Sequence, residues 1–222
     1  MNCSLTTIQQ MTQKPFKNLI WDFDGTLFDT YPVMLKALVQ ALTEFGVTSI
    51  DPESLYQTTK LKSVRFVEHA FAASHHFSAS ELTARYHELE QAMQVDPQPY
   101  PGAKKVLEMV MARGGHNFLD THRDQSVYRY LKDAGFESYF SGGIDADQTY
   151  PRKPDPGAIL GLIAEYHLDP AETVMIGDRR LDIEAGDNAK IATIYFNVDQ
   201  LNDSPMATIQ VQQLSEIMPY LA

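Results

Sequence analysis

Cysteine, long apolar runs and positive charge are all scarce in this sequence. The one cysteine among 222 residues, Cys3, rules out an intrachain disulfide. No apolar run approaches the roughly 18 residues that a membrane-spanning helix requires. The first residues, Met1–Gln10, lack the basic and apolar segments of a secretory signal peptide. We therefore expect a cytoplasmic protein that does not associate with membranes.

The shortage of positive charge limits the kinds of partner. The chain has 18 Lys and Arg against 29 Asp and Glu, a formal net charge of −11. Duplex nucleic acid and anionic lipid are bound through many lysine and arginine contacts, so neither is expected as a partner. A site for phosphate would have to be made positive locally, by a metal ion, a lysine or helix N-termini. The sequence also has no Gly-x-Gly-x-x-Gly and no Walker loop, which argues against a nucleotide cofactor held in those ways.

The chain is long for one domain of about 150 residues and short for two, which suggests one core domain with an insertion. After residue 98, short apolar runs alternate with amphipathic stretches, the pattern of a parallel α/β sheet covered on both faces. Five runs are predicted strands: Asn18–Trp21, Asn117–Leu119, Tyr139–Phe140, Thr173–Ile176 and Thr193–Phe196. The predicted fold is an α/β, Rossmann-like, doubly wound parallel sheet.

The segment between the first strand and residue 98 has a different pattern. It contains no convincing strand, and its apolar residues have helical spacing. Three helices are predicted from these residues: Leu35, Leu38, Leu42 and Phe45; Val64, Val67 and Phe71; Leu82, Tyr86, Leu89 and Met93. We therefore predict a loose tail over residues 1–15, an α/β core over residues 16–32 and 98–222, and an inserted all-helical domain over residues 33–97.

Polar side chains follow several of the predicted strands. Asp22 and Asp24 come after the first strand, Thr121 after the second and Asp178 after the Thr173–Ile176 strand, while Lys153 precedes a predicted helix. Ligands of open α/β sheets bind at the carboxyl ends of the strands, so these groups are expected to converge there. Clustered carboxylates repel one another unless a cation neutralises them, and an all-oxygen ligand set suits Mg²⁺. A magnesium ion with open positions could hold a phosphate oxygen.

At these residues the chain resembles the haloacid dehalogenase-superfamily phosphatases. The segment Asp22–Thr30 is similar to their first motif, Thr121 to the second, Lys153 in Arg152–Pro156 to the third, and Gly177–Gly186 to the fourth. The resemblance covers residues 17 to about 197. The helical insert resembles the cap of the subgroup that contains phosphoglycolate phosphatase and β-phosphoglucomutase.

The resemblance implies a role for each matching residue. Asp22 would be the nucleophile that forms an aspartyl-phosphate, and Asp24 would be the general acid and base. Mg²⁺ would be held by Asp22, the Asp24 backbone carbonyl and Asp178, with Asp182 in the outer shell. Thr121 and Lys153 would hold the phosphoryl oxygens. The implied enzyme is a magnesium-dependent hydrolase of a small phosphorylated metabolite, a monomer or homodimer.

Substrate selection is expected to fall to the helical insert, because the core motifs supply groups only for phosphate and metal. The basic stretch Thr58–Arg65 is the predicted contact, through Lys62 and Arg65, which are three residues apart and could share a helix face. On the core side, Arg123 could assist, with His122 a weaker candidate. A solvated basic turn is the alternative interpretation of the Thr58–Arg65 stretch.

Two other functions stay open from the sequence. A phosphomutase would share all four motifs, since it differs in how water is excluded from the phosphorylated enzyme. A phosphate-binding relative without turnover is favoured only by Asp120, which stands before Thr121 where the family usually has a small or apolar residue. A carboxylate there must find a donor or lie exposed, because burying it unpaired is costly. The adjacent His75 and His76 lack matching ligands and are expected to be an exposed pair.

Overall fold

The computed structural model describes residues 14–222, and these divide into two compact units. One unit, the core unit, comprises the chain up to Thr26 together with Tyr100–Ala222, and the other, the helical unit, comprises Leu27–Pro99. The expected boundaries of the insert, 33–97, lie inside the helical unit. The predicted tail over residues 1–15 falls almost entirely outside the described residues. No helix in the described part of the chain is long and apolar enough to span a membrane.

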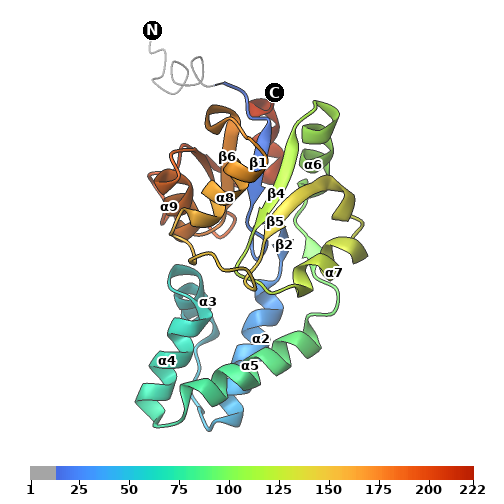
Figure 1. Cartoon of the computed structure of the whole chain (residues 1–222). Coiled ribbons are helices and arrows are strands. Elements are labelled where there is room, and N and C mark those ends of the chain that lie inside the picture. The colour runs from blue at the N-terminus through green and yellow to red at the C-terminus, as the bar shows by residue number, and fades with distance from the viewer. Residues whose placement is uncertain (1–13) are drawn as a thin grey trace. The chain divides into compact units, whose positions relative to one another are not determined.

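The core unit is built on a parallel sheet of six strands, in the order β5-β4-β1-β6-β7-β8. Strand β1, blue in Figure 1, lies between β4 and β6, so the chain builds one half of the sheet and then returns to build the other. This return creates the switch point at which such sheets bind ligands. The strands are β1 (Asn18–Trp21), β4 (His116–Asp120), β5 (Phe140–Ile144), β6 (Thr173–Gly177), β7 (Ala192–Phe196) and β8 (Ile209–Val211).

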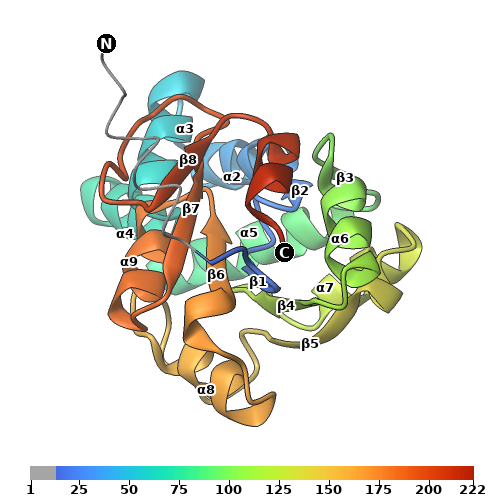
Figure 2. The ribbon, with the colours of Figure 1, turned by 90° about the horizontal axis from the view of Figure 1, so that it is seen from above.

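Helices cover both faces of this sheet. Helices α8 (Gly157–Glu165) and α9 (Arg180–Asn188) pack on one face, and α6 (Ala103–Ala112) packs on the other (Figure 2). Ile20, Phe118 and Met175 point from neighbouring strands into the α8 and α9 side, where all three are fully buried. The remaining elements are α7 (Ser126–Asp133) and the 3₁₀ helices η1 (Glu137–Tyr139), η2 (Pro170–Glu172) and η3 (Leu214–Tyr220). The predicted doubly wound α/β class is therefore confirmed.

The helical unit contains four helices, where the apolar spacing predicted three. They are α2 (Tyr31–Glu44), α3 (Pro52–Leu61), α4 (Val64–His75) and α5 (Ala79–Met93). Helix α3 was missed because it is mostly polar, but Asp51 caps its start by accepting a hydrogen bond from the Glu53 N–H. Ser63 and Ser78 cap α4 and α5 in the same way. The unit is not wholly helical, because the two-residue strands β2 (Phe28–Asp29) and β3 (Gln98–Pro99) pair antiparallel where the chain enters and leaves it.

The structure corrects three sequence expectations in detail. Strand β5 continues to Ile144 through two glycines, which sequence propensity disfavours in strands. The pair Asp155-Pro156 predicts a helix that is capped by Asp155 and begins at Pro156, but α8 begins one residue later, at Gly157, and the Asp155 carboxylate accepts from the Gly157 N–H. Lys62 and Arg65 do not share a helix face, because α3 ends at Leu61 and α4 begins at Val64.

Candidate active site

The turn after β1 places Asp22 and Asp24 at the carboxyl edge of the sheet. The β1 sequence Asn-Leu-Ile-Trp is buried along its whole length, and the Asp22 N–H continues the pairing with β6 by donating to the Ile176 carbonyl at 2.9 Å. Gly25 then reverses the chain at a φ of 80°, a conformation that costs glycine little. Asp22 is thereby held in the buried edge, while Asp24 is only partly buried.

Three carboxylates converge beside this turn. One oxygen each from Asp22, Asp178 and Asp182 lies within 4.8 Å of the others, and all three residues are buried. The Thr26 hydroxyl donates to Asp178 Oδ1 at 2.9 Å, a contact that the sequence analysis did not anticipate. Asp182, on the first turn of α9, comes close because Gly177 has no side chain: a Cβ there would overlap the Asp182 Cβ. The all-oxygen donor set and its negative charge fit a divalent cation.

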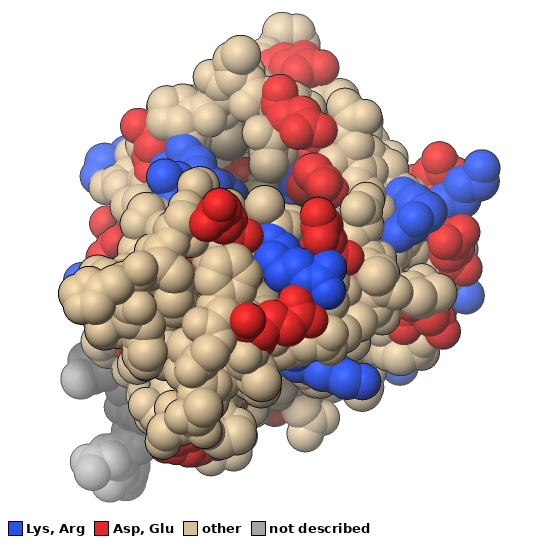
Figure 3. Space-filling view, turned by 90° about the horizontal axis from the view of Figure 1, so that it is seen from below, with Lys and Arg blue, Asp and Glu red and all other residues tan. Residues whose placement is uncertain are grey.

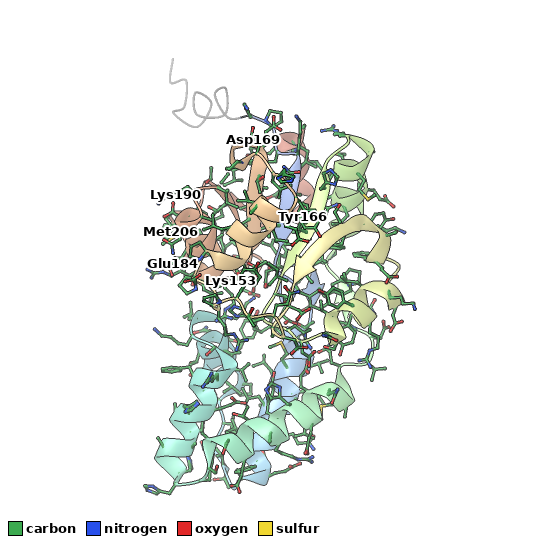
Figure 4. The ribbon with its side chains drawn as sticks, in the orientation of Figure 1. Lys153, Tyr166, Asp169, Glu184, Lys190 and Met206 are labelled. Atoms are coloured by element: carbon green, nitrogen blue, oxygen red, sulfur yellow. The ribbon has the colours of Figure 1, made fainter. Side chains whose placement is uncertain are left out.

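Lys153 joins this cluster from the loop that leads into α8 (Figure 4). Its Nζ lies 2.7 Å from Asp22 Oδ1 and 2.6 Å from Asp182 Oδ1, and it donates to the Asp120 carbonyl at 2.9 Å. The side chain is almost fully buried, which by itself would lower the pKa of the ammonium. The attraction of Asp182, Asp22 and Asp120 outweighs that cost and raises the pKa of Lys153, so the lysine stays charged.

Burial has the opposite consequence for the carboxyls. It raises the pKa of Asp22 well above its usual value, and it also raises the pKa of Asp182, with Lys153 partly offsetting both shifts. One ammonium therefore does not fully neutralise the cluster, and two positive charges from a divalent cation would complete the balance. This charge deficit is a second reason that the residues fit a metal ion.

Asp24 points to a different partner, Arg123. The Arg123 Nε donates to Asp24 Oδ1 at 2.9 Å and to Oδ2 at 3.1 Å, and Nη2 donates to Oδ1 at 2.7 Å. The guanidinium lies 5.9 Å from the centre of the Phe23 ring and 5.6 Å from that of Tyr130. Arg123 was expected to contact substrate, and the structure shows it holding Asp24.

Thr121 and His122 lie next to each other at the end of β4 and face protein groups. The buried Thr121 hydroxyl accepts from the Arg123 N–H at 3.1 Å, which leaves its own proton for another acceptor. The His122 Nε2 accepts from the Lys153 N–H at 3.0 Å. Burial, with Lys153, Arg152 and Arg179 nearby, lowers the pKa of His122 to about 2, so the ring is neutral and offers no positive charge to a substrate.

Asp120 is buried, and its Oδ2 has no hydrogen-bond partner among the described residues. It lines a cavity of about 100 Å³ together with Ile144, Asp145 and Tyr150. Burial raises the pKa of Asp120, with Lys153 partly offsetting the shift. Of the two outcomes expected for this carboxylate, a donor or an exposed position, Oδ2 shows neither.

Lys62 and Arg65 lie exposed in the helical unit, at the junction of α3 and α4. The third cation of that stretch, Lys60, is buried within the helical unit with its Nζ 4.0 Å from the centre of the Tyr31 ring. His75 and His76 are exposed, as expected. On the face seen in Figure 3, acidic and basic side chains lie among one another without forming a continuous patch of either sign.

Residues 19–196 match the family model of the haloacid dehalogenase-like hydrolases. The chain belongs to this family. It is 30% identical over 188 residues to the phosphoglycolate phosphatase of Psychrobacter arcticus, covering 79% of this chain and 81% of that protein. It is 27% identical over 179 residues to the pyrophosphatase PpaX of Listeria innocua, covering 79% of this chain and 80% of that protein.

A solved hydrolase from Streptococcus pneumoniae TIGR4 is 32% identical to this haloacid dehalogenase-like hydrolase, with a TM-score of 0.61. The alignment covers 85% of this chain and 99% of that one. The family match spans β1, β4, β6 and the loop that carries Lys153, so all four motifs lie inside it.

Proposed function

We propose that this hydrolase is a magnesium-dependent phosphatase of a small phosphate monoester, working through an aspartyl-phosphate on Asp22. The observation that carries the proposal is the contact of Lys153 Nζ with Asp22, at the carboxyl end of β1, and with Asp182, on the first turn of α9. A buried carboxylate beside a fixed ammonium suits attack on a phosphate, because the lysine offsets the repulsion between the two anions.

Mg²⁺ would be held by Asp22 and Asp178 and by the backbone carbonyl of Asp24, with Asp182 behind them. When bound, it supplies charge neutralisation at the transferring phosphoryl group. Lys153 and the Thr121 hydroxyl bind the phosphoryl oxygens, and Lys153 also keeps Asp22 oriented. The buried position of Asp22 limits the access of water to the nucleophile until the substrate is in place.

The reaction divides into two steps at Asp22. In the first, the Asp22 carboxylate attacks phosphorus, the bond to the leaving oxygen breaks, and Asp24 gives its proton to that oxygen. In the second, Asp24 removes a proton from a water molecule, which attacks phosphorus and releases phosphate from Asp22. Asp24 is thereby returned to its protonated form.

The substrate class follows from the similarity to a protein named phosphoglycolate phosphatase and from the site, which holds groups for phosphate and metal. We propose a small phosphorylated metabolite, with 2-phosphoglycolate as the first compound to test. Inorganic pyrophosphate belongs in the same panel because a second relative is named a pyrophosphatase. Selection among such compounds is assigned to the helical unit through Lys62 and Arg65.

Phosphate release from a panel of phosphorylated metabolites tests the proposal. The wild type with Mg²⁺ should release phosphate, a chelator should stop the reaction, and added Mg²⁺ should restore it. Ca²⁺ should substitute poorly, because its larger and looser coordination shell relaxes the geometry of in-line transfer. Full turnover in excess chelator would contradict the metal assignment.

The Asp22→Asn variant should lose turnover and should not gain the mass of one phosphoryl group on rapid quenching with substrate. The matched control is Asp169→Asn, because Asp169 is exposed at the opposite end of the core unit from Lys153 (Figure 4). Turnover within tenfold of wild type in Asp22→Asn would contradict the nucleophile assignment. Transfer of the phosphoryl group to a second sugar phosphate instead of to water would favour the phosphomutase.

A further inference from the structure

The bidentate contact between Arg123 and Asp24 engages both carboxylate oxygens of the proposed acid and base. The Nε and Nη2 of Arg123 lie 2.7–3.1 Å from these oxygens, and the arginine side chain is only 8% exposed. A planar guanidinium that meets a carboxylate in this way fixes the plane of the carboxylate as well as its position. An ammonium at the same place would fix only a distance.

Arg123 is itself held from several sides within the core unit. Its backbone N–H donates to Thr121 Oγ1, and its carbonyl accepts from the Ala146 N–H at 2.9 Å. Its guanidinium lies near the Phe23 and Tyr130 rings, which stack with their centres 6.2 Å apart. Phe23 stands between Asp22 and Asp24, so the arginine is fixed relative to the segment that carries both.

A general acid has a strict geometric requirement. Asp24 must bring one oxygen to the leaving oxygen while Asp22 attacks phosphorus on the opposite side, and a displacement of about 1 Å can cost about a hundredfold in rate. Asp24 directly precedes Gly25 at the turn and is only partly buried, so its local chain alone does not fix its side chain. The hydrogen bonds from Arg123 hold the Asp24 carboxylate in one orientation.

We propose that Arg123 is a positioning residue for Asp24, and not a substrate-binding cation. In the first step the proton passes from Asp24 to the leaving oxygen as the phosphorus–oxygen bond breaks, and in the second Asp24 takes a proton from water. Arg123 keeps all its protons throughout and holds one orientation of the carboxyl group. This inference rests on the proposed function, because it takes Asp24 as the acid.

The experiment measures how the fall in kcat/KM caused by replacing Arg123 depends on the leaving group. Arg123→Gln and Arg123→Lys are compared with wild type on p-nitrophenyl phosphate, phenyl phosphate and ethyl phosphate. kcat/KM is the quantity to compare, since it reports the steps up to release of the leaving group and not the later hydrolysis. The matched control is Arg129→Ala, an exposed arginine whose guanidinium also lies near Tyr130, at 4.9 Å.

General acid catalysis contributes about 10²- to 10⁴-fold, and only poor leaving groups need it. Arg123→Gln should therefore lower kcat/KM for ethyl phosphate about 10- to 100-fold and that for p-nitrophenyl phosphate less than about threefold. Arg123→Lys should show the same trend, because lysine keeps the charge but not the bidentate contact. The double variant Asp24→Asn with Arg123→Gln should be no slower than Asp24→Asn alone.

An equal loss on all three esters would overturn the inference, as would a rise of KM confined to substrates with a second anionic group. If Arg123→Gln fails to fold, judged by its circular dichroism and melting curve, Arg123→Lys carries the same comparison. A failure of the proposed function gives a different result. If Asp24 is not the general acid, Asp24→Asn should lower kcat/KM by the same factor for all three esters.

Discussion

The ammonium of Lys153 lies 2.7 Å from the carboxylate of Asp22, although 131 residues separate them in sequence. The contact is almost fully buried, and the same ammonium reaches Asp182. Lys153 Nζ therefore joins three segments: Asp22 after β1, the Asp120 carbonyl at the end of β4, and Asp182 on the first turn of α9. We therefore expect Lys153 to contribute both to the stability of this edge of the sheet and to its chemistry.

Replacing Lys153 with methionine should destabilise the protein by about 3–5 kcal/mol at pH 7, the usual cost of leaving a buried charge without its partner. Burial already raises the pKa values of Asp22 and Asp182, and without the lysine they rise further. Carboxyls whose pKa is raised by folding destabilise the native state above their unfolded pKa, and that cost disappears as the pH falls. The loss should therefore be smaller at pH 5 than at pH 7.

Urea unfolding of Lys153→Met at both pH values measures this effect. The control is Lys17→Met, which removes an exposed contact with Glu172 at 2.9 Å and should cost no more than about 1 kcal/mol. Equal losses in the two variants, or a loss that grows as the pH falls, would contradict the role given to Lys153.

Asp120→Asn should stabilise the protein. The raised pKa shows that ionised Asp120 destabilises the native state above its unfolded pKa, and no donor among the described residues satisfies Oδ2. Removing the charge should add about 1–3 kcal/mol at pH 8, or about 2–4 °C in melting temperature for each kcal/mol. The gain should shrink towards pH 4, where the unfolded chain also begins to be protonated.

Melting curves from pH 8 to pH 4.5 test this expectation, with Asp147→Asn, an exposed residue in the loop after β5, as the control. A gain that is constant with pH would mean that the charge of Asp120 is not its cause. The variant should also bind a phosphate monoester more tightly, because one negative charge near the site is gone.

His122→Gln should reduce the acid sensitivity of the fold. The pKa of His122 is about 2 in the native state and about 6.5 in an unfolded chain, so above pH 6.5 the ring is neutral in both. Below pH 6.5 only the unfolded chain takes up the proton, and stability falls as the pH falls, by up to about 1.4 kcal/mol per pH unit. A glutamine oxygen can still accept from the Lys153 N–H, but it does not titrate.

The difference in unfolding free energy between wild type and His122→Gln, measured at pH 7.5, 6.5 and 5.5, isolates this contribution. The unfolding free energy of the variant should rise relative to that of the wild type as the pH is lowered. The exposed His69, replaced in the same way, serves as the control. A difference that stays flat across this range would show that the ring is protonated in the native state as well.

Lys62→Ala and Arg65→Ala should lower the rate on the best natural substrate far more than on p-nitrophenyl phosphate. Both cations are exposed in the helical unit at the junction of α3 and α4, where they can meet a second anionic group. Steady-state rates on the two substrates are the measurement, and Lys36→Ala on the exposed face of α2 is the control. Equal losses on both substrates would remove these two residues from substrate recognition.

Most of the sheet was predictable because a strand buried on both faces needs a continuous apolar run, as in Asn18–Trp21 and Thr173–Ile176. Strand β5 was predicted only at its start, since Gly142 and Gly143 lack the side chains that mark a strand. A Cβ at Gly142 would overlap the Tyr166 hydroxyl, so that side chain would have to move if Gly142 were replaced. Helix α3 was not predicted because few of its residues are apolar; the side-chain cap from Asp51 marks its start.

The sequence by itself determined the order of the chemistry-bearing residues and their places at strand ends, since apolar runs and turn glycines are local signals. Only the tertiary structure decided the partners of those residues. It paired Arg123 with Asp24, turned His122 towards the Lys153 backbone and buried Asp120 Oδ2 without a donor among the residues that the structure describes. These outcomes depend on packing between segments distant in sequence, such as Gly177 against Asp182 and β4 against the loop before α8. Hydrogen-bond geometry and burial arise from that packing, and neither is encoded in any single stretch of the chain.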